Sequence, residues 1–464
     1  MAVKRKKKEE VAVDENMSFA DAMEDVVEDL TEGMPEKVFC SSGNSLLDRI
    51  LGGGFLTGNY HVLCAPSQSG KSSIAICTVT KFLEQYEKGI VFWIDAEQST
   101  VDERFMQLGV PYAHKLDENG NEIIDPETGM PMPQMRKTKN RKTGEIKSSV
   151  EWDNRFMKVS VNVTLETAFK LIDKAVEKKV AIGREDEPMI VVLDSLTSMV
   201  TEEELEAENS NKVIGQKARG VDFCLKRHLF KLAQYNICML IIAHIGNKLS
   251  MNPYEAYDGK MSSLQNLTLP GGKSLQYFPF NIVMFRSYVA KKYTEKIAEY
   301  GVSNGFIMTA TTLKARGYAS NITVPLVYGM FTGFEEYPTR YYNMIEDDWI
   351  VGKSTTYKTL PEFPDKKFTT KSFFEKVAKD PEFREMVDIS WRNYITERYK
   401  KYGIAMRAQE MAGQSLPEDE DLESDEIEEE MEKLMSMGEP GEIESHSPGT
   451  ANFKKKPSSV YEEE

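Results

Sequence analysis

The sequence predicts an α/β fold, a doubly wound and mostly parallel sheet with helices on both faces. Between about residues 38 and 329, short apolar runs alternate with longer segments whose apolar residues recur every three or four positions, which is typical of strand–helix–strand units. After about residue 281 the strand-like runs follow one another directly, and we expect them to extend the sheet as antiparallel strands. The expected strands are residues 60–64, 90–94, 157–161, 189–193, 237–243, 282–289, 305–313 and 321–328, and the expected helices are residues 73–87, 165–179 and 212–235.

The first expected strand runs into a loop, residues 65–72, that reads A-P-S-Q-S-G-K-S and opens a helix. In this pattern backbone N–H groups and the helix N-terminus bind phosphates, Lys71 reaches the terminal phosphates, and Ser72 binds Mg²⁺. The sequence therefore predicts a nucleotide site, with Ala65 in place of the first glycine of the pattern. The expected nucleotide contacts in this segment are Ala65, Pro66, Ser67, Gln68, Ser69, Gly70, Lys71, Ser72 and Ser73.

Two further strands end in carboxylates. Residues 189–195 read M-I-V-V-L-D-S, and we expect Asp194, at the carboxyl end of a parallel strand beside the phosphate loop, to hold Mg²⁺ directly or through water. Residues 91–97 read V-F-W-I-D-A-E, and a strand adjacent to the phosphate-loop strand would bring Glu97 within reach of an attacking water as the general base. The alternative for Glu97 is a simple turn residue at a strand end.

Composition limits the class of protein. The chain has 464 residues, 41% of them hydrophobic, without an apolar run long enough for a membrane span or a signal peptide. Its five cysteines form no C-x-x-C pair, so we expect reduced thiols in the cytoplasm. The net charge is -16, but residues 415–464 hold 17 acidic residues against 4 lysines, so the remaining residues carry only -3. This acidic tail is expected to be disordered, either as a solubilising segment or as a polyanion that competes with DNA for a basic surface.

The same patterns divide the chain into four parts. Residues 1–37 hold a basic start and a helix at 18–30 that docks on its own domain or on a neighbouring protomer, residues 38–336 form the core, residues 337–414 form a small separate lobe with helices at 370–379 and 383–399, and residues 415–464 form the tail. Residues 115–154 interrupt the core as an inserted hairpin or flexible loop, which is either solvated or a DNA or partner contact. Its basic residues are Arg136, Lys137, Lys139, Arg141 and Lys142.

Several motifs together resemble the RecA/RadA family of homologous-recombination ATPases over roughly residues 38–329. They are I-D-A-E at 94–97, L-G-V at 108–110, V-V-L-D-S at 191–195 and P-G-G-K-S-L-Q-Y-F at 270–278. The phosphate loop, Ala243-His244 and the acidic C-terminus are similar to phage UvsX-type recombinases in particular, and residues 19–22 fit the F-x-x-A docking motif of RadA-like proteins.

This resemblance implies a RecA-like ATPase core with an ATP site between protomers of a helical filament. It implies that Lys314 and Arg316, two cations spaced by two on a strand, reach the γ-phosphate of the neighbouring protomer, and that His244 senses the γ-phosphate and pulls on a DNA-binding loop. Arg104 or Phe105 is expected to stack on adenine. The DNA-binding segments implied are residues 203–219 and 246–276, with the candidate contacts Gly215, Lys217, Arg219, Lys248, Lys260, Gly271, Gly272 and Lys273.

The expected function is that of an ATP- and Mg²⁺-dependent DNA recombinase that polymerises on single-stranded DNA and exchanges strands with duplex DNA in recombination, repair and recombination-dependent replication. The expected partners are both forms of DNA, further copies of the chain, and loading, mediator and single-strand-binding proteins, in the cytoplasm, or the host cytoplasm if the chain is phage-encoded. Two alternatives stay open. A ring-shaped hexameric helicase shares the core but should carry a larger domain than the 37 residues before it, and a recombinase paralogue would bind nucleotide as a mediator without hydrolysing it.

Overall fold

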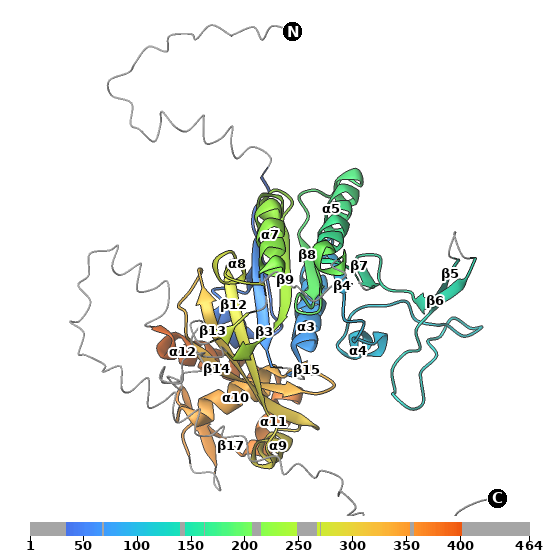
Figure 1. Cartoon of the computed structure of the whole chain (residues 1–464). Helices are drawn as coiled ribbons and strands as arrows, with labels where there is room; N and C mark the ends of the chain where they lie inside the picture. Colours follow the sequence, from blue (N-terminus) through green and yellow to red (C-terminus); the bar gives the residue numbers. More distant parts are fainter. Residues whose placement is uncertain are drawn as a thin grey trace, which may run out of the picture.

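The computed structural model describes residues 34–66, 69–139, 144–161, 163–206, 215–247, 267–269, 271–352 and 357–400. These residues contain a nine-stranded sheet with the strand order β15-β14-β13-β12-β3-β9-β8-β4-β7 (Figure 1). The strands from β12 to β7 are mutually parallel, and β13, β14 and β15 are antiparallel to their neighbours. The predicted α/β fold, mostly parallel with added antiparallel strands, is confirmed. Its strands are β3 (Asn59–Ala65), β4 (Ile90–Asp95), β7 (Phe156–Ser160), β8 (Met189–Asp194), β9 (Ile237–His244), β12 (Asn281–Tyr288), β13 (Gly305–Ala315), β14 (Thr323–Gly329) and β15 (Gly333–Phe334).

One strand direction differs from the prediction. The strand β12, expected to be antiparallel, pairs in parallel with β3, and only its other neighbour β13 is antiparallel to it. The chain returns from the end of β9 through β10 (Gly246–Asn247), β11 (Leu267–Thr268) and α8 (Ser274–Tyr277) before it enters β12. This crossover brings the chain back to the end of the sheet at which β3 begins. A strand that starts at that end runs parallel to β3.

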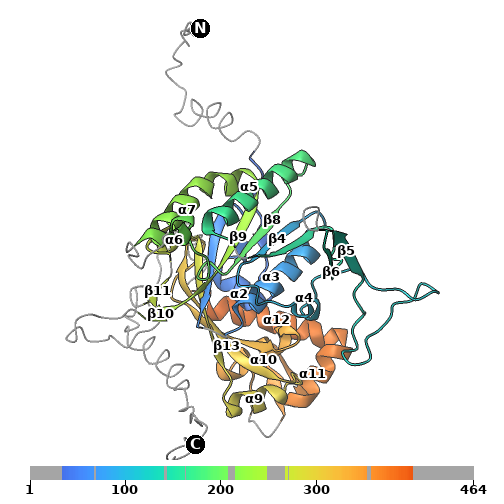
Figure 2. The same cartoon turned by 45° about the vertical axis from the view of Figure 1, so that its right-hand side comes forward.

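Helices cover both faces of the sheet (Figure 2). Successive residues of β3 alternate between two hydrophobic clusters, with Leu63 in the cluster that contains α3 (Lys71–Gln85) and Val62 in the cluster that contains α5 (Leu165–Ala181) and α7 (Gln216–Gln234). Because side chains on a strand point alternately to its two faces, a strand buried on both faces reads as a continuous apolar run. This is the physical reason that apolar runs predicted the central strands.

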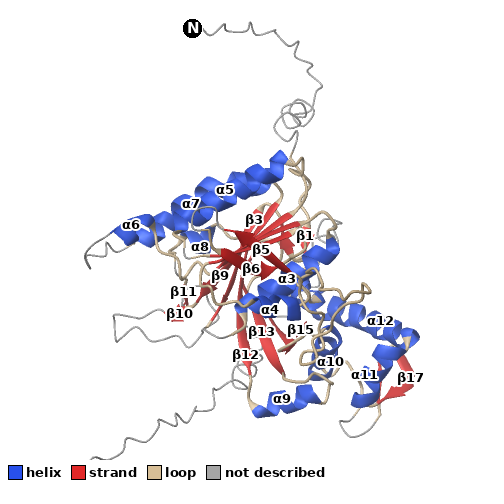
Figure 3. Ribbon diagram, turned by 90° about the vertical axis from the view of Figure 1, so that its right-hand side faces the viewer, coloured by secondary structure: helices blue, strands red, loops and turns tan. Residues whose placement is uncertain are grey.

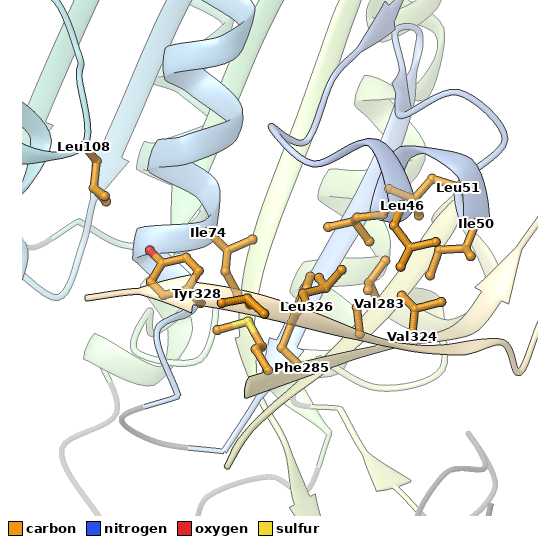
Figure 4. Close-up of a cluster of buried hydrophobic side chains, with 14 of the residues drawn as sticks. Leu46, Ile50, Leu51, Ile74, Leu108, Val283, Phe285, Val324, Leu326 and Tyr328 are labelled. Atoms are coloured by element: carbon orange, nitrogen blue, oxygen red, sulfur yellow. The ribbon is translucent and has the colours of Figure 1, made fainter. Parts of the chain in front are cut away.

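The cluster beneath α3 fixes the helix that follows the phosphate loop. Figure 4 shows Ile74 of α3 above Phe285 of β12 and Leu326 of β14, with Leu46 of α2 (Ser45–Ile50) beside them. All four side chains have no exposed surface. The N-terminus of α3 is therefore supported by a packed layer that joins sheet and helices.

The C-terminal part packs against this layer as well. The predicted helix at 370–379 is α11 (Thr370–Lys379), and the one at 383–399 is α12 (Pro381–Arg398). Aromatic side chains of α10 (Glu336–Glu346), α11 and α12 belong to the same hydrophobic cluster as α2 and β12, and Trp391 Nε1 donates to Ser45 Oγ at 3.2 Å. Figure 3 shows α11, α12 and β17 at one end of the molecule. The described part of the predicted lobe thus shares its core with the sheet, and its limits stay a prediction.

Within the insertion, β5 (Met135–Lys139) and β6 (Ile146–Val150) pair as antiparallel strands of a hairpin, the first of the two predicted alternatives. It projects from the body at the right of Figure 1. The remaining elements are β1 (Phe39–Cys40), β2 (Phe55–Leu56), α4 (Asp102–Gln107), α6 (Glu202–Glu206), α9 (Lys291–Ala298), β16 (Lys358–Leu360) and β17 (Phe363–Phe368).

The five cysteines are free thiols, as predicted. In the part of the chain that the structure describes, no helix is both long and apolar enough to span a membrane. The predicted helix at 18–30, its docking motif at 19–22, Arg141 and Lys142, and the acidic tail at 415–464 lie outside the described residues.

Candidate active site

A pocket of about 340 Å³ opens at the carboxyl ends of the central parallel strands, where ligands bind in open α/β sheets. It gathers most of the predicted catalytic and metal-binding residues. The lining residues are Gly70, Lys71, Ser72, Ser73, Glu97, Ser99, Thr100, Val101, Arg104, Asp194 and His244.

The phosphate loop ends at a helix N-terminus without a side-chain cap. Gly70 precedes α3 with a φ of 77°, a left-handed conformation that favours glycine, and it has no side chain to accept from the free N–H groups of the first turn. These donors are available to an anion. Ala65, in contrast, is fully buried in the hydrophobic cluster beneath α3. Its methyl group is accommodated there, outside the pocket lining.

Lys71 is 7% exposed, and its ammonium donates to the Pro66 carbonyl at 2.9 Å. The same Nζ lies 3.2 Å from His244 Nδ1. Burial lowers the pKa of Lys71 below its usual value, while Glu97 and Asp194 oppose this shift. A lysine held in this way has its charge inside the pocket, where phosphate oxygens would replace the histidine nitrogen as acceptor.

His244 connects Lys71 to Glu97. Because an ammonium only donates, His244 Nδ1 accepts and the ring proton lies on Nε2, which is 3.4 Å from Glu97 Oε1. The same carboxylate oxygen accepts a hydrogen bond from the Ser195 hydroxyl. The side chains Lys71, His244 and Glu97 therefore form one connected row across the pocket, the Lys71–His244–Glu97 row.

The route by which Glu97 reaches the pocket differs from the prediction. Its strand β4 is not adjacent to β3, since β9 and β8 lie between them. The chain turns after β4 so that the Ala96 N–H donates to the Asp194 carbonyl, and this turn carries Glu97 over the end of β8. The predicted neighbour relation was wrong, although Glu97 does line the pocket.

Asp194 and Ser72 fit a magnesium site completed by a bound phosphate. Burial raises the pKa of Asp194 to about 7, Asp95 and Glu97 add to the rise, and a hydrogen bond from Ser72 opposes it. Among the residues that the structure describes, the buried Oδ1 of Asp95 also finds no hydrogen-bond partner. Such crowded carboxylates favour a cation nearby. A pair of protein ligands fits Mg²⁺, because this ion usually takes few protein ligands besides phosphate and water.

Of the two residues predicted to stack on adenine, the structure excludes Phe105. Its side chain has no exposed surface and packs edge-on against Trp93, with ring centroids 4.9 Å apart. On α4, Phe105 belongs to the hydrophobic cluster, whereas its neighbour Arg104 faces the pocket. Arg104 does line the pocket, where its Nε donates to Ser73 Oγ at 3.1 Å and another nitrogen donates to the Met330 carbonyl.

Lys314 and Arg316 do not line the pocket of their own chain. Both donate to the Tyr277 carbonyl, at 2.7 Å and 2.8 Å, so they point the same way as predicted. Burial, followed by the charge of Arg316, lowers the pKa of Lys314 to about 8. In the sheet, Lys314 lies opposite Ile282 of β12, and Ile282 pairs with Val62 of β3. Val62 stands three residues before the end of β3.

The first candidate DNA segment is attached to the pocket. Gly215 precedes α7 with a φ of 92°, and Lys217 in the first turn donates from Nζ to the Thr197 carbonyl at 2.7 Å. Burial lowers the pKa of Lys217. Thr197 Oγ1 in turn accepts from the backbone N–H of His244 at 2.9 Å. Arg219 is exposed.

The glycines of the second candidate segment have an internal packing role. A Cβ on Gly271 would lie 2.7 Å from Leu275, and a Cβ on Gly272 would lie 2.8 Å from the Ala218 side chain on α7. Both glycines also have positive φ angles. Lys273 is exposed beside them. The predicted contacts Ser67, Gln68, Lys248 and Lys260 lie outside the described residues.

Sequence reasoning did not single out three residues that hold the site together. Ser195 donates to Glu97, Thr197 links His244 to Lys217, and Thr100 donates to Asp194 Oδ2 at 3.4 Å. Ser195 follows Asp194 directly in the sequence, and Thr197 follows two residues later. Polar residues just beyond a strand that ends in a carboxylate were therefore the available signal.

Comparison with known proteins gives RecA proteins as relatives, at low identity. The chain is 24% identical over 263 residues to the RecA protein of Desulforapulum autotrophicum, covering 55% of this chain and 57% of that protein, and 25% identical over 245 residues to RecA of Mycoplasma mycoides, covering 51% and 52%. RecA of Mesoplasma florum is 22% identical over 364 residues, covering 72% of this chain and 87% of that protein.

The chain spans little more than half the length of the first two relatives. No family model matches it. The similarity to several RecA proteins supports the RecA family, and together with the nine-stranded sheet it identifies the fold as a RecA-like core.

Proposed function

We propose that this chain is an ATP-dependent recombinase that polymerises on single-stranded DNA and exchanges strands with a homologous duplex in recombination, repair and recombination-dependent replication. The observation that carries the proposal is the Lys71–His244–Glu97 row beside Ser72 and Asp194. It combines a phosphate cradle, a metal-binding pair and a carboxylate base in one pocket of a RecA-like core. The motifs similar to phage UvsX-type recombinases support the narrower class.

The residues of the pocket divide the work of hydrolysis. Bound ATP would supply the phosphoanhydride bond that breaks, and Mg²⁺ would neutralise its charge. The free N–H groups after Gly70 and the ammonium of Lys71 hold phosphate oxygens, and Ser72 and Asp194 hold the metal. Glu97 takes the proton of the attacking water. Arg104 borders the base end of the nucleotide.

Coupling to DNA runs through Thr197. Its hydroxyl holds the backbone of His244, and its carbonyl holds Lys217 at the start of α7. A DNA phosphate that draws Lys217 away would break its hydrogen bond to Thr197. Thr197 positions the backbone of His244, so this change would reach the pocket. His244 contacts both Lys71 and Glu97, so the proposal accounts for hydrolysis that depends on DNA.

The position of Lys314 and Arg316 supports a site completed by a neighbour. Neither lines the pocket of its own chain, and each is held by the carbonyl of Tyr277. In a filament they would act as cations on the γ-phosphate of the next protomer, where charge develops in the transition state. We further propose residues 1–37 for docking, residues 38–336 as the ATPase core, residues 337–414 as a C-terminal lobe, and residues 415–464 as an acidic tail. Loading, mediator and single-strand-binding proteins are the proposed partners.

The test is ATP hydrolysis by the full chain with and without single-stranded DNA. We expect stimulation by DNA, and its loss in Lys71→Ala. Lys81→Ala is the matched control, because Lys81 is an exposed residue of the same helix and pairs with Glu84 outside the pocket. Hydrolysis indifferent to DNA would refute the proposal, and closed rings on DNA in electron micrographs, in place of helical filaments, would favour a helicase.

A further inference from the structure

We infer that the hairpin of β5 and β6, residues 135–139 and 146–150, is a second DNA-binding surface that holds the phosphate backbone of a duplex. We call it the basic ribbon. The inference rests on the proposed function, since it assigns the ribbon to the incoming duplex in strand exchange. It concerns the insertion that lies outside the motifs shared with the RecA/RadA family.

The basic ribbon presents uncompensated positive charge. All five residues of β5 are exposed, and three of them are Arg136, Lys137 and Lys139. With the described part of the chain, these three side chains make neither an ion pair nor a hydrogen bond. On the body, the exposed lysines Lys170 and Lys226 instead pair with Glu202 and Asp222. Unpaired cations on a projecting element attract a polyanion.

The spacing of these cations fits a nucleic-acid backbone. Lys137 and Lys139 lie on one face of β5, roughly 7 Å apart, and two successive nucleotides advance about 6.8 Å along a DNA strand. Ser148 lies opposite Lys137, and Ser149 lies opposite Arg136 on the other face. Serine hydroxyls beside cations are common phosphate contacts.

The ribbon favours paired over unpaired DNA. Surfaces for single strands combine basic residues with aromatic side chains on which bases stack. The described residues of the ribbon include no aromatic side chain, and their exposed apolar residues are Met135 and Ile146. A duplex keeps its bases stacked inside and offers its phosphates, which is what the ribbon is equipped to bind.

The ribbon is held firmly by the body. At its base Val150 is buried, and Trp152 packs against Phe156 and Phe105, with ring centroids 5.2 Å and 5.9 Å away. The backbone of Ala113 bonds to Glu151, which bonds to Gln134 in turn, so a third segment braces the hairpin. A surface held in place loses less conformational entropy on binding.

The ribbon also lies away from the candidate single-strand segments. In sequence the ribbon lies between α4 and the edge strand β7, whereas the candidate single-strand segments follow β8 and β9 in the middle of the sheet. Figures 1 and 2 show the β5–β6 hairpin projecting from one side, and in Figure 2 β10 and β11 lie on the opposite side. The protein can therefore hold two DNA molecules at once.

The test replaces Arg136, Lys137 and Lys139 with glutamine together. The matched control replaces Lys170, Lys174 and Lys178, three exposed lysines of α5, and removes the same charge. Binding of a labelled duplex of unrelated sequence is measured over a salt series, to the full chain alone and to the full chain assembled on single-stranded DNA with a slowly hydrolysed ATP analogue. Binding of single-stranded DNA, filament formation in electron micrographs and hydrolysis stimulated by single-stranded DNA are measured in parallel.

We expect the ribbon variant to bind duplex at least tenfold more weakly, with the slope of log affinity against log salt smaller by about 2 to 3. The reason is that each phosphate contact releases about 0.9 counterions when it forms, and the variant loses three such contacts. Its hydrolysis stimulated by single-stranded DNA should stay within twofold of that of the control. Unchanged duplex binding, or an equal loss of single-strand binding, would overturn the inference. Loss of filaments in the ribbon variant would identify the ribbon as a contact between protomers. Tighter duplex binding by the variant would identify the acidic tail as the occupant of the ribbon. Either result also overturns the inference. If single-stranded DNA does not stimulate hydrolysis in the unsubstituted chain, the proposed function is contradicted and not the inference about the ribbon. Duplex binding by the chain alone still tests the ribbon in that case.

Discussion

Replacing Glu97 with glutamine separates the chemistry of the pocket from its geometry. Both contacts of the carboxylate, the hydroxyl of Ser195 and the imidazole of His244, go to the same oxygen, Oε1. Glutamine keeps an oxygen at this position, so it can accept both hydrogen bonds. It loses only the basicity that removes a proton from water.

The size of the expected effect follows from this single loss. A positioned general base contributes about 10²- to 10⁴-fold, which corresponds to roughly 3 to 5 kcal/mol in the activation barrier. We therefore expect the DNA-stimulated turnover of Glu97→Gln to fall by that factor. Lys71, Ser72 and Asp194 remain in place, so nucleotide affinity should change by no more than about threefold, since no phosphate or metal contact is removed.

The assay compares turnover, nucleotide affinity and filament lifetime in the presence of single-stranded DNA. Glu103→Gln is the matched control, because Glu103 is an exposed residue of α4 outside the pocket lining. Under the proposed function, in which hydrolysis would release the DNA, filaments of Glu97→Gln should persist longer. Turnover within about threefold of that of the control would refute the assignment of Glu97 as the base, and equal losses of affinity and turnover would assign it a binding role.

Two further predictions concern residues outside the reacting groups. Phe105→Ala should destabilise the fold by about 3 to 5 kcal/mol, as expected for a fully buried ring, whereas Phe105→Leu should fold and bind ATP normally; a higher KM for ATP in Phe105→Leu, read beside its thermal unfolding, would return this residue to the nucleotide site. Burial raises the pKa of Asp48 to about 6, so the folded state holds the proton more tightly than the unfolded state between about pH 4 and 6. The free energy of unfolding should fall by up to about 3 kcal/mol as pH rises through this window, and stay level above it. Asp48→Asn should remove this pH dependence. If thermal unfolding of the two proteins changes with pH by the same amount from pH 4 to 7, the prediction is contradicted.

The local patterns of the chain predicted much of the fold. Central strands buried on both faces appear as continuous apolar runs, and the loop before α3 carries its Gly-Lys-Ser signature, so both could be found without knowledge of their neighbours. The direction of β12 could not be found in this way. It depends on which edge the chain returns to after β9, and no residue within β12 encodes that route.

The sequence by itself determined the kinds of group in the site: a lysine and a serine at a helix start, and carboxylates at strand ends. Only the tertiary structure decided which of them meet. Strand order separates β4 from β3 by two strands, and a turn over β8 brings Glu97 back to His244 and Lys71. The inward turn of α4 likewise buries Phe105 and leaves Arg104 in the pocket. The physical reason is that a strand pattern specifies which side chains share a face, whereas distance across a sheet depends on strand order and on the turns between strands, which are properties of the whole chain.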